Sequence, residues 1–256
     1  MKQIARLDYL DLQIYEERKT TLSVDEKDED GLPYTTTLMV GDALAHELFK
    51  LMQMPVHYST WNSLCLYQSE SKEVVLASRP VQKSAQFKGL FFLRPDAIAI
   101  LQSVINFLKE RKIKFLVSRI DISFITNEPN LYQALDRCDF KRLTQYLLKK
   151  KKETVYYKAY NSRFALVAYA KSAQIKKEKG SDYLKKFLSY YELAELPEDL
   201  VNLELRVLGT DACGEITEQI IDKIDLKALK ALVIEQSTKR IKLTKKIHKL
   251  LLKSPI

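Results

Sequence analysis

The chain has few of the residues from which disulfide frameworks and zinc sites are built. Its three cysteines, Cys65, Cys138 and Cys213, are widely separated and lack the paired spacing of metal-binding motifs. The sequence also contains no His-x-His pair, so a metal site built on two neighbouring histidines is excluded. We therefore expect buried thiols in a reducing compartment, and we expect carboxylates to hold any bound metal.

Long apolar runs are missing as well. No run approaches the roughly 18 residues that a membrane span needs, and the first residues are not followed by an apolar stretch of the kind found in secretory leaders. No internal repeat of fixed period is found. We therefore expect a soluble cytoplasmic protein with no membrane contact.

Basic residues outnumber acidic ones. The chain of 256 residues has 42 lysines and arginines against 33 aspartates and glutamates, a formal net charge of +9. This surplus favours an acidic polymer such as nucleic acid as partner, although an ordinary basic soluble protein has the same balance. The hydrophobic content of 46% is sufficient for a substantial core without disulfide bonds.

Hydrophobic periodicity predicts an α+β fold. Alternating patterns predict strands within 2–40 and over 62–68, 73–79, 87–93, 114–125, 154–160, 163–170 and 200–208, with a tight turn at Asn161-Ser162. Helical spacing predicts helices over 42–53, 94–108, 130–152, 171–195 and 238–253. We expect a mainly antiparallel central sheet backed by helices over residues 1–210, with a duplicated strand-helix-strand unit as one interpretation, and a basic helical C-terminal extension over 211–256.

Three predicted strands carry ionisable groups between apolar neighbours. They are Ser118–Asp121, Leu166–Lys171 and Val201–Arg206. Side chains on one face of a sheet lie side by side, so an acid from the first strand, a tyrosine and a lysine from the second and an acid from the third are expected to converge. This combination suits phosphodiester chemistry with a tyrosine nucleophile and a divalent metal ion.

The same segments resemble a known family. The run Leu166-Val167-Ala168-Tyr169-Ala170-Lys171 is similar to the Leu-Val-Ala-Tyr-x-Lys motif of the filamentous-phage replication endonucleases, the gene II proteins, and related motifs occur in plasmid rolling-circle initiators. Pro55–Ser59, Ser118–Asp121 and Leu200–Val207 are similar to further motifs of that family, in the same order. The resemblance covers residues 55–208 and implies a metal-dependent, origin-specific endonuclease that nicks and joins DNA to initiate rolling-circle replication.

The resemblance assigns the nucleophilic step to Tyr169. Its hydroxyl would attack a phosphodiester, form a 5′-phosphotyrosine link and free a 3′-hydroxyl primer. A phenol with a pKa of roughly 10 needs a nearby cation or metal to attack at neutral pH, and Lys171 is expected near the phosphate. Asp121 and Glu204, with Glu73 as a third acid, are expected to bind Mg²⁺ or Mn²⁺ through oxygen.

The residues expected to bind DNA are basic. They are Arg119, Arg163 and Arg206 in the predicted strands and Lys242 and Lys246 in the predicted C-terminal helix. The expected partners are the replication origin, as supercoiled DNA or as a single-stranded nick site, and a host helicase and polymerase. A homodimer is left open.

Each residue also has a purely structural interpretation. Tyr169 is one of 14 tyrosines, and a strand tyrosine is usually part of a core. Asp121 shares a strand face with Arg119 and is able to form an ion pair with it. Glu204 has the same relationship to Arg206. For the whole protein, the alternatives are a non-catalytic origin-binding protein or replication repressor, a conjugative relaxase, and a structural protein with no role on DNA.

Overall fold

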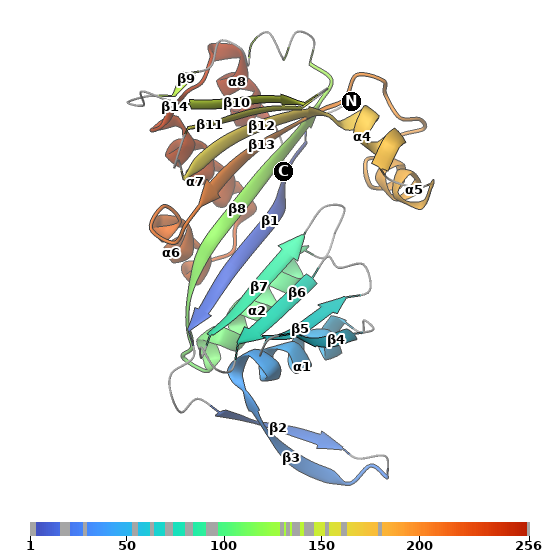
Figure 1. The fold of residues 1–256 in the computed structure, drawn as a ribbon, viewed down its shortest axis with the longest axis vertical. Coiled ribbons are helices and arrows are strands. Elements are labelled where there is room, and N and C mark those ends of the chain that lie inside the picture. The colour runs from blue at the N-terminus through green and yellow to red at the C-terminus, as the bar shows by residue number, and fades with distance from the viewer. Residues whose placement is uncertain are drawn as a thin grey trace. The chain divides into compact units, whose positions relative to one another are not determined.

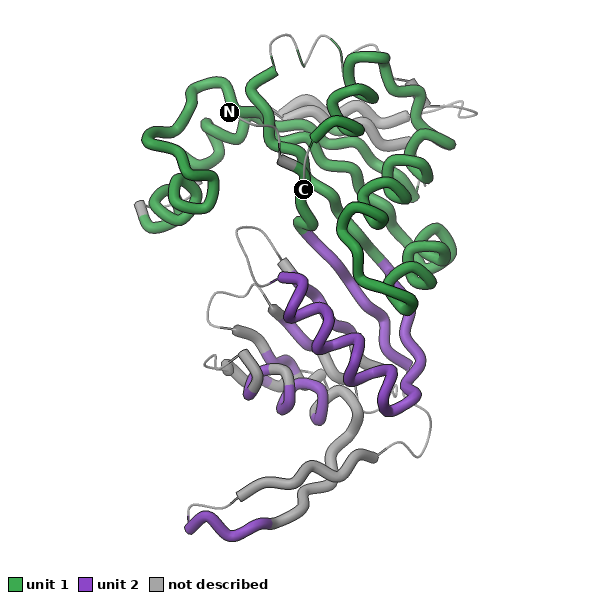
Figure 2. Tube along the Cα trace, turned by 180° about the vertical axis from the view of Figure 1, so that it is seen from behind, with its two compact units in different colours: residues 1–8, 92–94, 119–256 green, residues 9–91, 95–118 purple. Residues whose placement is uncertain are grey.

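Antiparallel strands and the helices packed on them make up the described part of the chain (Figure 1). The structure is a computed structural model, and it describes residues 4–15, 21–27, 30–52, 56–61, 64–69, 74–79, 84–90, 97–128, 131, 134, 139–140, 146–151, 154–159, 163–178 and 181–254. The chain divides into two compact units (Figure 2): a first unit of residues 1–8, 92–94 and 119–256, and a second unit of residues 9–91 and 95–118. Strands β1 (Ile4–Tyr15) and β8 (Lys114–Thr126) contribute residues to both.

The sheet of the first unit has the strand order β10-β11-β12-β13-β8-β1. Its other strands are β10 (Tyr146–Lys151), β11 (Thr154–Ala159), β12 (Phe164–Ala170) and β13 (Val201–Leu208). The pairs from β10 to β13, and the pair of β13 with β8, are antiparallel. The register places Tyr169 opposite Asn202 and Arg206 opposite Asp121, which brings the three polar segments of the sequence onto neighbouring strands.

The described helices of the first unit occur at two places in the sequence, between β12 and β13 and after β13. Helices α4 (Lys171–Glu178) and α5 (Ser181–Tyr190) connect β12 to β13, and α6 (Gly214–Asp222), α7 (Leu226–Thr238) and α8 (Lys245–Lys253) follow β13. A short pair is formed by β9 (Asp139–Phe140) and β14 (Ile241–Lys242). The α4 and α5 segment is anchored by an apolar cluster made of Ile125, Ile175, Phe187, Tyr191 and Leu200.

The two faces of this sheet differ in chemistry because side chains alternate along each strand. Leu166 of β12, Leu203 and Leu205 of β13 and Phe124 of β8 share one face and are fully buried. Helix α7 packs on β13 at this apolar face. The opposite face carries Tyr169 and its polar neighbours, and we call it the polar face.

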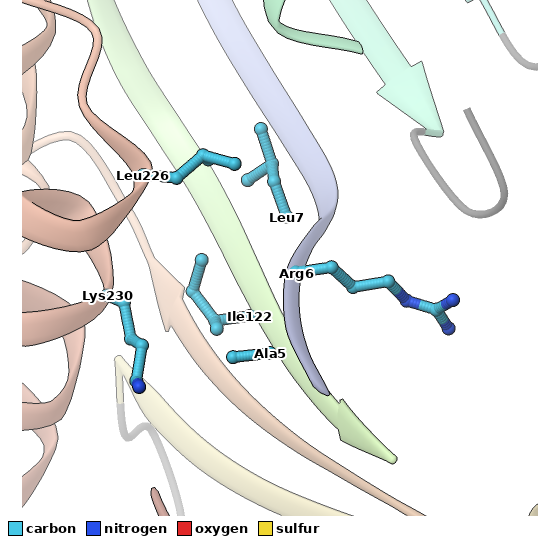
Figure 3. Close-up of a pocket in the computed structure, with 6 residues that line it drawn as sticks. All are labelled: Ala5, Arg6, Leu7, Ile122, Leu226 and Lys230. Atoms are coloured by element: carbon cyan, nitrogen blue, oxygen red, sulfur yellow. The ribbon is translucent and has the colours of Figure 1, made fainter. Parts of the chain in front are cut away.

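A small hollow beside β1 lies on the apolar face of the sheet (Figure 3). It is lined by Ala5, Arg6, Leu7, Ile122, Leu226 and Lys230 and has no space for a bound molecule. Leu226 and Lys230 of α7 lie on the same side of β1 as Leu7, whereas the Arg6 side chain points the other way. Arg6 therefore projects from the side of β1 that lies away from α7.

The second unit is a meander of strands with two helices. Its strand order is β1-β7-β6-β5-β4, with β4 (Val56–Trp61), β5 (Leu64–Ser69), β6 (Val74–Arg79) and β7 (Ser84–Leu90) all in antiparallel pairs. Helices α1 (Val40–Met52) and α2 (Ala97–Glu110) contact each other, and β2 (Thr21–Lys27) and β3 (Pro33–Met39) form a separate hairpin. Leu12, Phe87 and Leu101 are fully buried in this unit.

The helix predicted over 130–152 is wrong for residues 146–151, which form strand β10. Leucine and lysine favour helices when propensity alone decides. Here each residue from 146 to 151 instead pairs with a residue of β11, and this tertiary pairing overrides the local preference. Strand β10 is the last in the strand order, a position where lysines are common because they oppose pairing with a second chain.

The C-terminal helix begins later than predicted. Thr244 has an extended backbone, and its side chain accepts a hydrogen bond from the Ile247 N–H, so it caps α8 at Lys245. Lys242 consequently lies in the short strand β14 and not in the helix predicted over 238–253. The predicted turn at Asn161-Ser162 falls outside the described residues.

The predicted fold class, α+β with a mainly antiparallel sheet backed by helices, is confirmed. The two strand-helix-strand runs, β7-α2-β8 and β12-α4-α5-β13, differ in how their strands are arranged. Strands β12 and β13 pair directly with each other, whereas β1 lies between β7 and β8 in the strand order. Helices α6, α7 and α8 belong to the same unit as β12 and β13, so the division into 1–210 and 211–256 does not coincide with the compact units and stays a prediction. Within the described ranges, no helix has the length and apolar character required to cross a membrane.

Candidate active site

Tyr169 and Glu204 form the centre of a polar cluster on the polar face of the first unit. The Tyr169 hydroxyl donates a hydrogen bond to Oε1 of Glu204 at 2.8 Å. Glu204 lies diagonally from Tyr169 across the β12–β13 pair, since the residue directly opposite Tyr169 is Asn202. The Glu204 side chain is only 4% exposed, so its charge acts in a largely dry environment.

Asn202 bridges these two residues. Its Nδ2 donates to the Tyr169 hydroxyl oxygen at 2.7 Å and to Oε1 of Glu204 at 2.9 Å, and it lies 3.3 Å from Oγ of Ser123 on β8. Asn202 is fully buried. A continuous network of hydrogen bonds therefore links β8, β13 and the tyrosine on β12.

Asp8 of β1 extends this network. Its side chain is 15% exposed, it hydrogen-bonds to the Ser123 side chain, and the charges of Glu204 and Lys171 act on it. The Nε of Arg6, two residues away on the same strand face, lies 3.8 Å from Oδ1 of Asp8. Burial raises the pKa of the Asp8 carboxyl above its ordinary value, opposed by Arg6 and reinforced by Glu204.

Arginines pair with the two predicted metal-binding acids. Arg206 contacts Oε2 of Glu204 through Nε at 3.0 Å and through Nη2 at 2.5 Å, and its Nε lies 3.4 Å from Oδ2 of Asp121. Arg119 binds Asp121 with two hydrogen bonds, at 2.9 and 2.5 Å. The ladder of ion pairs considered from the sequence is thus present, and it runs from β8 to β13.

Lys171 places a further positive charge beside the tyrosine. Strand β12 ends at Ala170, so Lys171 opens helix α4, yet the residue is 3% exposed and is not a solvated lysine. Its Nζ donates to Oε1 of Gln174 at 2.9 Å and lies 5.4 Å from the centre of the Tyr169 ring. Lys171 therefore lies near the tyrosine, through a helix start and not through a shared strand, and its expected contact with the phosphate stays a prediction.

The surroundings hold Tyr169 as a neutral phenol. Burial raises the pKa of its hydroxyl far above the ordinary value, and the negative charges of Glu204 and Asp8 raise it further, whereas the hydrogen bond from Asn202 lowers it. Because only the ionised or ionising oxygen is a good nucleophile, Tyr169 needs added positive charge or a proton acceptor to react.

Asp121 is also poorly solvated. Burial raises the pKa of its carboxyl to about 6, and this effect outweighs the neighbouring Arg119 and Arg206, which lower it. The charge of Glu204 raises it as well. Asp121 therefore gains a proton more readily than an exposed aspartate as the pH falls.

The donor set of the cluster fits a hard divalent cation by type. Oxygen is the ligand that Mg²⁺ and Mn²⁺ prefer, and two oxygens, Asp8 Oδ1 and Asn202 Oδ1, are buried without a hydrogen bond to the described residues. They lie in one network with the Glu204 carboxylate. In the part of the chain that the structure describes, no three acidic, histidine or cysteine side chains are close enough together to form a ready metal site.

The remaining predicted residues lie away from this cluster. Arg163 is half exposed and its Nη1 binds Oδ1 of Asp211 at 2.5 Å, and Lys246 of α8 lies 3.2 Å from Oε1 of Glu128. Lys242 is exposed on β14. Glu73 lies outside the described residues, so its predicted role as a third acid is untested.

Sequence reasoning missed Asp8 and Asn202. Asp8 carries a recognisable pattern: Arg6-Leu7-Asp8 has the same arginine-x-acid spacing as Arg119-Ile120-Asp121. Two such pairs within predicted strands indicate a shared polar face. Strand β13 contains the same pair in the reverse order, as Glu204-Leu205-Arg206. Asn202 carries no such signal, because a neutral amide within an apolar strand has many ordinary explanations.

Comparison with known proteins agrees with this fold. Residues 93–216 match the model of a family described as the N-terminal part of a replication-associated protein of the phage gene II type. No curated protein sequence matches the chain significantly. Among solved structures, a rolling circle replication initiator protein from Geobacillus stearothermophilus covers 99% of this chain and 92% of its own length, with a TM-score of 0.55 and 9% sequence identity. At this identity the likeness shows the fold alone.

The class defined by fold and site is therefore an α+β protein with the initiator fold and a tyrosine-carboxylate cluster. Over residues 93–216 the chain matches the replication-associated proteins of the gene II type, which confirms the family resemblance drawn from the motifs. The matched segment contains most of the predicted site residues, namely Arg119, Asp121, Arg163, Tyr169, Lys171, Glu204 and Arg206. Asp8, Glu73, Lys242 and Lys246 lie outside it.

Proposed function

We propose that the protein is a rolling-circle replication initiator that nicks and rejoins one strand of origin DNA through Tyr169. The observation that carries the proposal is the hydrogen bond from the Tyr169 hydroxyl to Glu204, because it pairs a nucleophile with a proton acceptor. The family match supports it, since the matched segment contains both residues. The shared fold with a protein named as a rolling-circle initiator is consistent with it.

The nicking step follows from this pair. The Tyr169 oxygen attacks the scissile phosphorus while its proton passes to Oε1 of Glu204, and the bond from phosphorus to the 3′-oxygen breaks. The leaving 3′-oxygen takes up a proton from solvent. The products are a 5′-phosphotyrosine link and a 3′-hydroxyl that a host polymerase would extend while a host helicase unwinds the duplex. In joining, a 3′-hydroxyl attacks the phosphotyrosine and restores the strand without ATP.

Positive charge around the tyrosine would stabilise the reacting phosphate. Lys171 Nζ lies close to the Tyr169 ring and brings a cation near the nucleophile. Arg206 and Arg119 add charge along the same sheet face. Fixed cations near a phosphoryl group stabilise the negative charge that spreads over its oxygens.

A divalent cation, Mg²⁺ or Mn²⁺, would take oxygen ligands from Glu204, Asp121 and Asp8, and these acids would have to move closer together than they lie in this arrangement. When bound there, it supplies Lewis acidity toward the phosphate and positive charge that offsets the acids around Tyr169. Asp121 and Glu204 would then share their carboxylates between the ion and their arginines. Asp8 joins the proposed ligands because it lies in the hydrogen-bond network, and Glu73, which lies outside the described residues, stays a predicted ligand.

A non-catalytic origin-binding protein is the second candidate. It is favoured by the resting state of the cluster, in which Asp121 and Glu204 are already paired with arginines. Such a protein would keep the fold and bind origin DNA without forming a covalent link.

The two candidates are distinguished by a covalent-adduct assay. The protein is incubated with supercoiled DNA carrying the origin of its own replicon and with Mg²⁺ or Mn²⁺, and the DNA is then examined for nicked circles with protein on the 5′ end. We expect adducts with the unaltered protein and none with Tyr169→Phe, which should retain its affinity for DNA. Tyr190→Phe is the matched control, because Tyr190 lies on α5 with 37% exposure.

The outcomes separate cleanly. An adduct that survives in Tyr169→Phe contradicts the assignment of the nucleophile. Origin binding without any adduct in the unaltered protein contradicts the enzyme and supports the second candidate.

A further inference from the structure

We infer that Asn202 is a catalytic hydrogen-bond donor that stabilises the oxygen of Tyr169 as it becomes the nucleophile. The inference rests on the proposed function and gives a role to a residue to which the recognised motifs assign none. Its basis is geometric: the amide nitrogen of Asn202 lies within hydrogen-bond distance of both atoms that exchange the proton, the Tyr169 oxygen and Oε1 of Glu204.

The orientation of the amide is set by its neighbours. A carboxylate oxygen accepts hydrogen bonds only, so the side of the amide that faces Glu204 has to be the NH₂ group. If the amide were turned over, its carbonyl oxygen would lie against the carboxylate and the tyrosine would lose a donor. Asn202 Oδ1 then faces away from both, and it has no hydrogen-bond partner within the described residues.

The strength of this hydrogen bond depends on the charge of Tyr169. With a neutral phenol it is an ordinary hydrogen bond, whereas an ionising phenol turns it into a charge-assisted one, which is shorter and stronger. Asn202 therefore stabilises the reacting form of Tyr169 more than the resting form, which is the requirement for catalysis. Because Asn202 is completely buried, water does not compete for the hydrogens of its amide group.

Burial makes a merely structural asparagine a costly choice at this position. The directly opposite residue is Tyr169 itself, and the neighbours on the same strand face in β13 are Glu204 and, further along, Arg206. An apolar residue would satisfy the packing of a fully buried strand position without leaving Oδ1 unpartnered. The amide is thus best explained by its two donated hydrogen bonds.

The test compares Asn202→Leu, which is close in size and donates no hydrogen bond, with the unaltered protein in the covalent-adduct assay. We expect the rate of adduct formation to fall on the order of 100-fold, as for the loss of one preorganised donor. Thr217→Val on α6 is the control, because it also removes a buried polar group but lies outside the cluster. Thermal unfolding and DNA affinity are measured for all three proteins.

A second measurement detects the donor function itself. Tyr169 is replaced by 3-fluorotyrosine, whose hydroxyl is more acidic. If Asn202 stabilises the ionising oxygen, the fluorinated nucleophile depends less on Asn202. The factor by which Asn202→Leu slows adduct formation should then be at least about 10-fold smaller with 3-fluorotyrosine than with tyrosine. A purely structural role predicts the same loss with both nucleophiles, and that result overturns the inference, as does an unchanged rate in Asn202→Leu. Absence of adduct in the unaltered protein would instead contradict the proposed function.

Discussion

The hydroxyl of Tyr169 donates to Oε1 of Glu204 across two antiparallel strands, at 2.8 Å. The two residues are 35 positions apart in the sequence and are brought together by the β12–β13 register, which places them as diagonal neighbours. The same carboxylate binds Arg206 through its other oxygen. Glu204 thus joins Tyr169 to the row of ion pairs on the polar face.

Replacing Glu204 with glutamine tests its proposed role as proton acceptor. The amide oxygen of Glu204→Gln is still able to accept the hydrogen bond from Tyr169, but it cannot take up the proton. We expect adduct formation to fall by at least about 100-fold, as for loss of a general base, with DNA affinity retained. Glu198→Gln, an exposed change in the segment between α5 and β13, is the control. Full activity in Glu204→Gln would show that the proton leaves by another route.

Arg206 and Arg163 provide a matched pair for measuring ion pairs. The Arg206 side chain is 26% exposed and contacts two nearly buried acids, whereas that of Arg163 is 52% exposed and pairs with an exposed aspartate. Because Arg206→Met leaves the nearly buried Glu204 carboxylate without its arginine, while Asp121 keeps Arg119, we expect a loss of about 3 kcal/mol in the free energy of unfolding. Arg163→Met should cost no more than about 1 kcal/mol.

Urea unfolding measures both values, and added Mg²⁺ or Mn²⁺ extends the test to metal binding. A cation held by the same acids should restore stability to Arg206→Met more than to the unaltered protein. Equal losses in the two variants would contradict the buried ladder, and an equal response to the cation would contradict metal binding at these acids.

The convergence of Tyr169, Asp121 and Glu204 is predictable because each motif is local. Tyr169, Asp121 and Glu204 lie within short strands whose alternation fixes which side chains share a face. Their convergence then requires only that the strands be neighbours, as antiparallel neighbours in an α+β sheet commonly are. The fold class follows from the same alternation.

The features that escape prediction depend on contacts between distant segments. Asp8 meets Ser123 only through the placement of β1 beside β8, and no local pattern encodes that neighbour. The sequence of strand β10 predicts a helix because leucine and lysine favour helices in isolation, and its pairing with β11 decides otherwise. Asn202 gives no signal in the sequence because its role comes from the atoms around it.

Gly209 has a backbone conformation that favours glycine. Its φ of +92° lies in the left-handed region, and a Cβ added there would overlap Nη1 of Arg163. Gly209→Ala should therefore cost about 1–2 kcal/mol in the free energy of unfolding through backbone strain and displacement of Arg163. Gly214→Ala is the control, because nothing lies within 4 Å of its added Cβ and Gly214 begins α6.

The control should be neutral or slightly stabilising, since alanine restricts the unfolded chain more than glycine does. Chemical unfolding of the two variants measures the difference. If Gly209→Ala is as stable as Gly214→Ala, the left-handed conformation at residue 209 is contradicted.

The raised pKa of Asp121 makes stability depend on pH. The carboxyl has a pKa of about 6 in the folded protein against an ordinary value of 3.8, so between these values the folded state binds more protons than the unfolded state. The contribution of Asp121 to the free energy of unfolding therefore falls as the pH rises from about 4 to 6. The total change is up to about 3 kcal/mol, because each pKa unit corresponds to about 1.4 kcal/mol.

Asp121→Asn removes this titration, so the test compares the difference in stability between the variant and the unaltered protein at two pH values. We expect the stability of the variant relative to the unaltered protein to be up to about 3 kcal/mol more favourable at pH 7 than at pH 4. Urea unfolding at pH 4, 5, 6 and 7 measures it, with Asp182→Asn on the exposed side of α5 as the control for the chemical substitution. If the stability of Asp121→Asn relative to the unaltered protein did not change with pH, the raised pKa of Asp121 would be contradicted. If it changed in the opposite direction, Arg119 and Arg206 would outweigh the burial of Asp121.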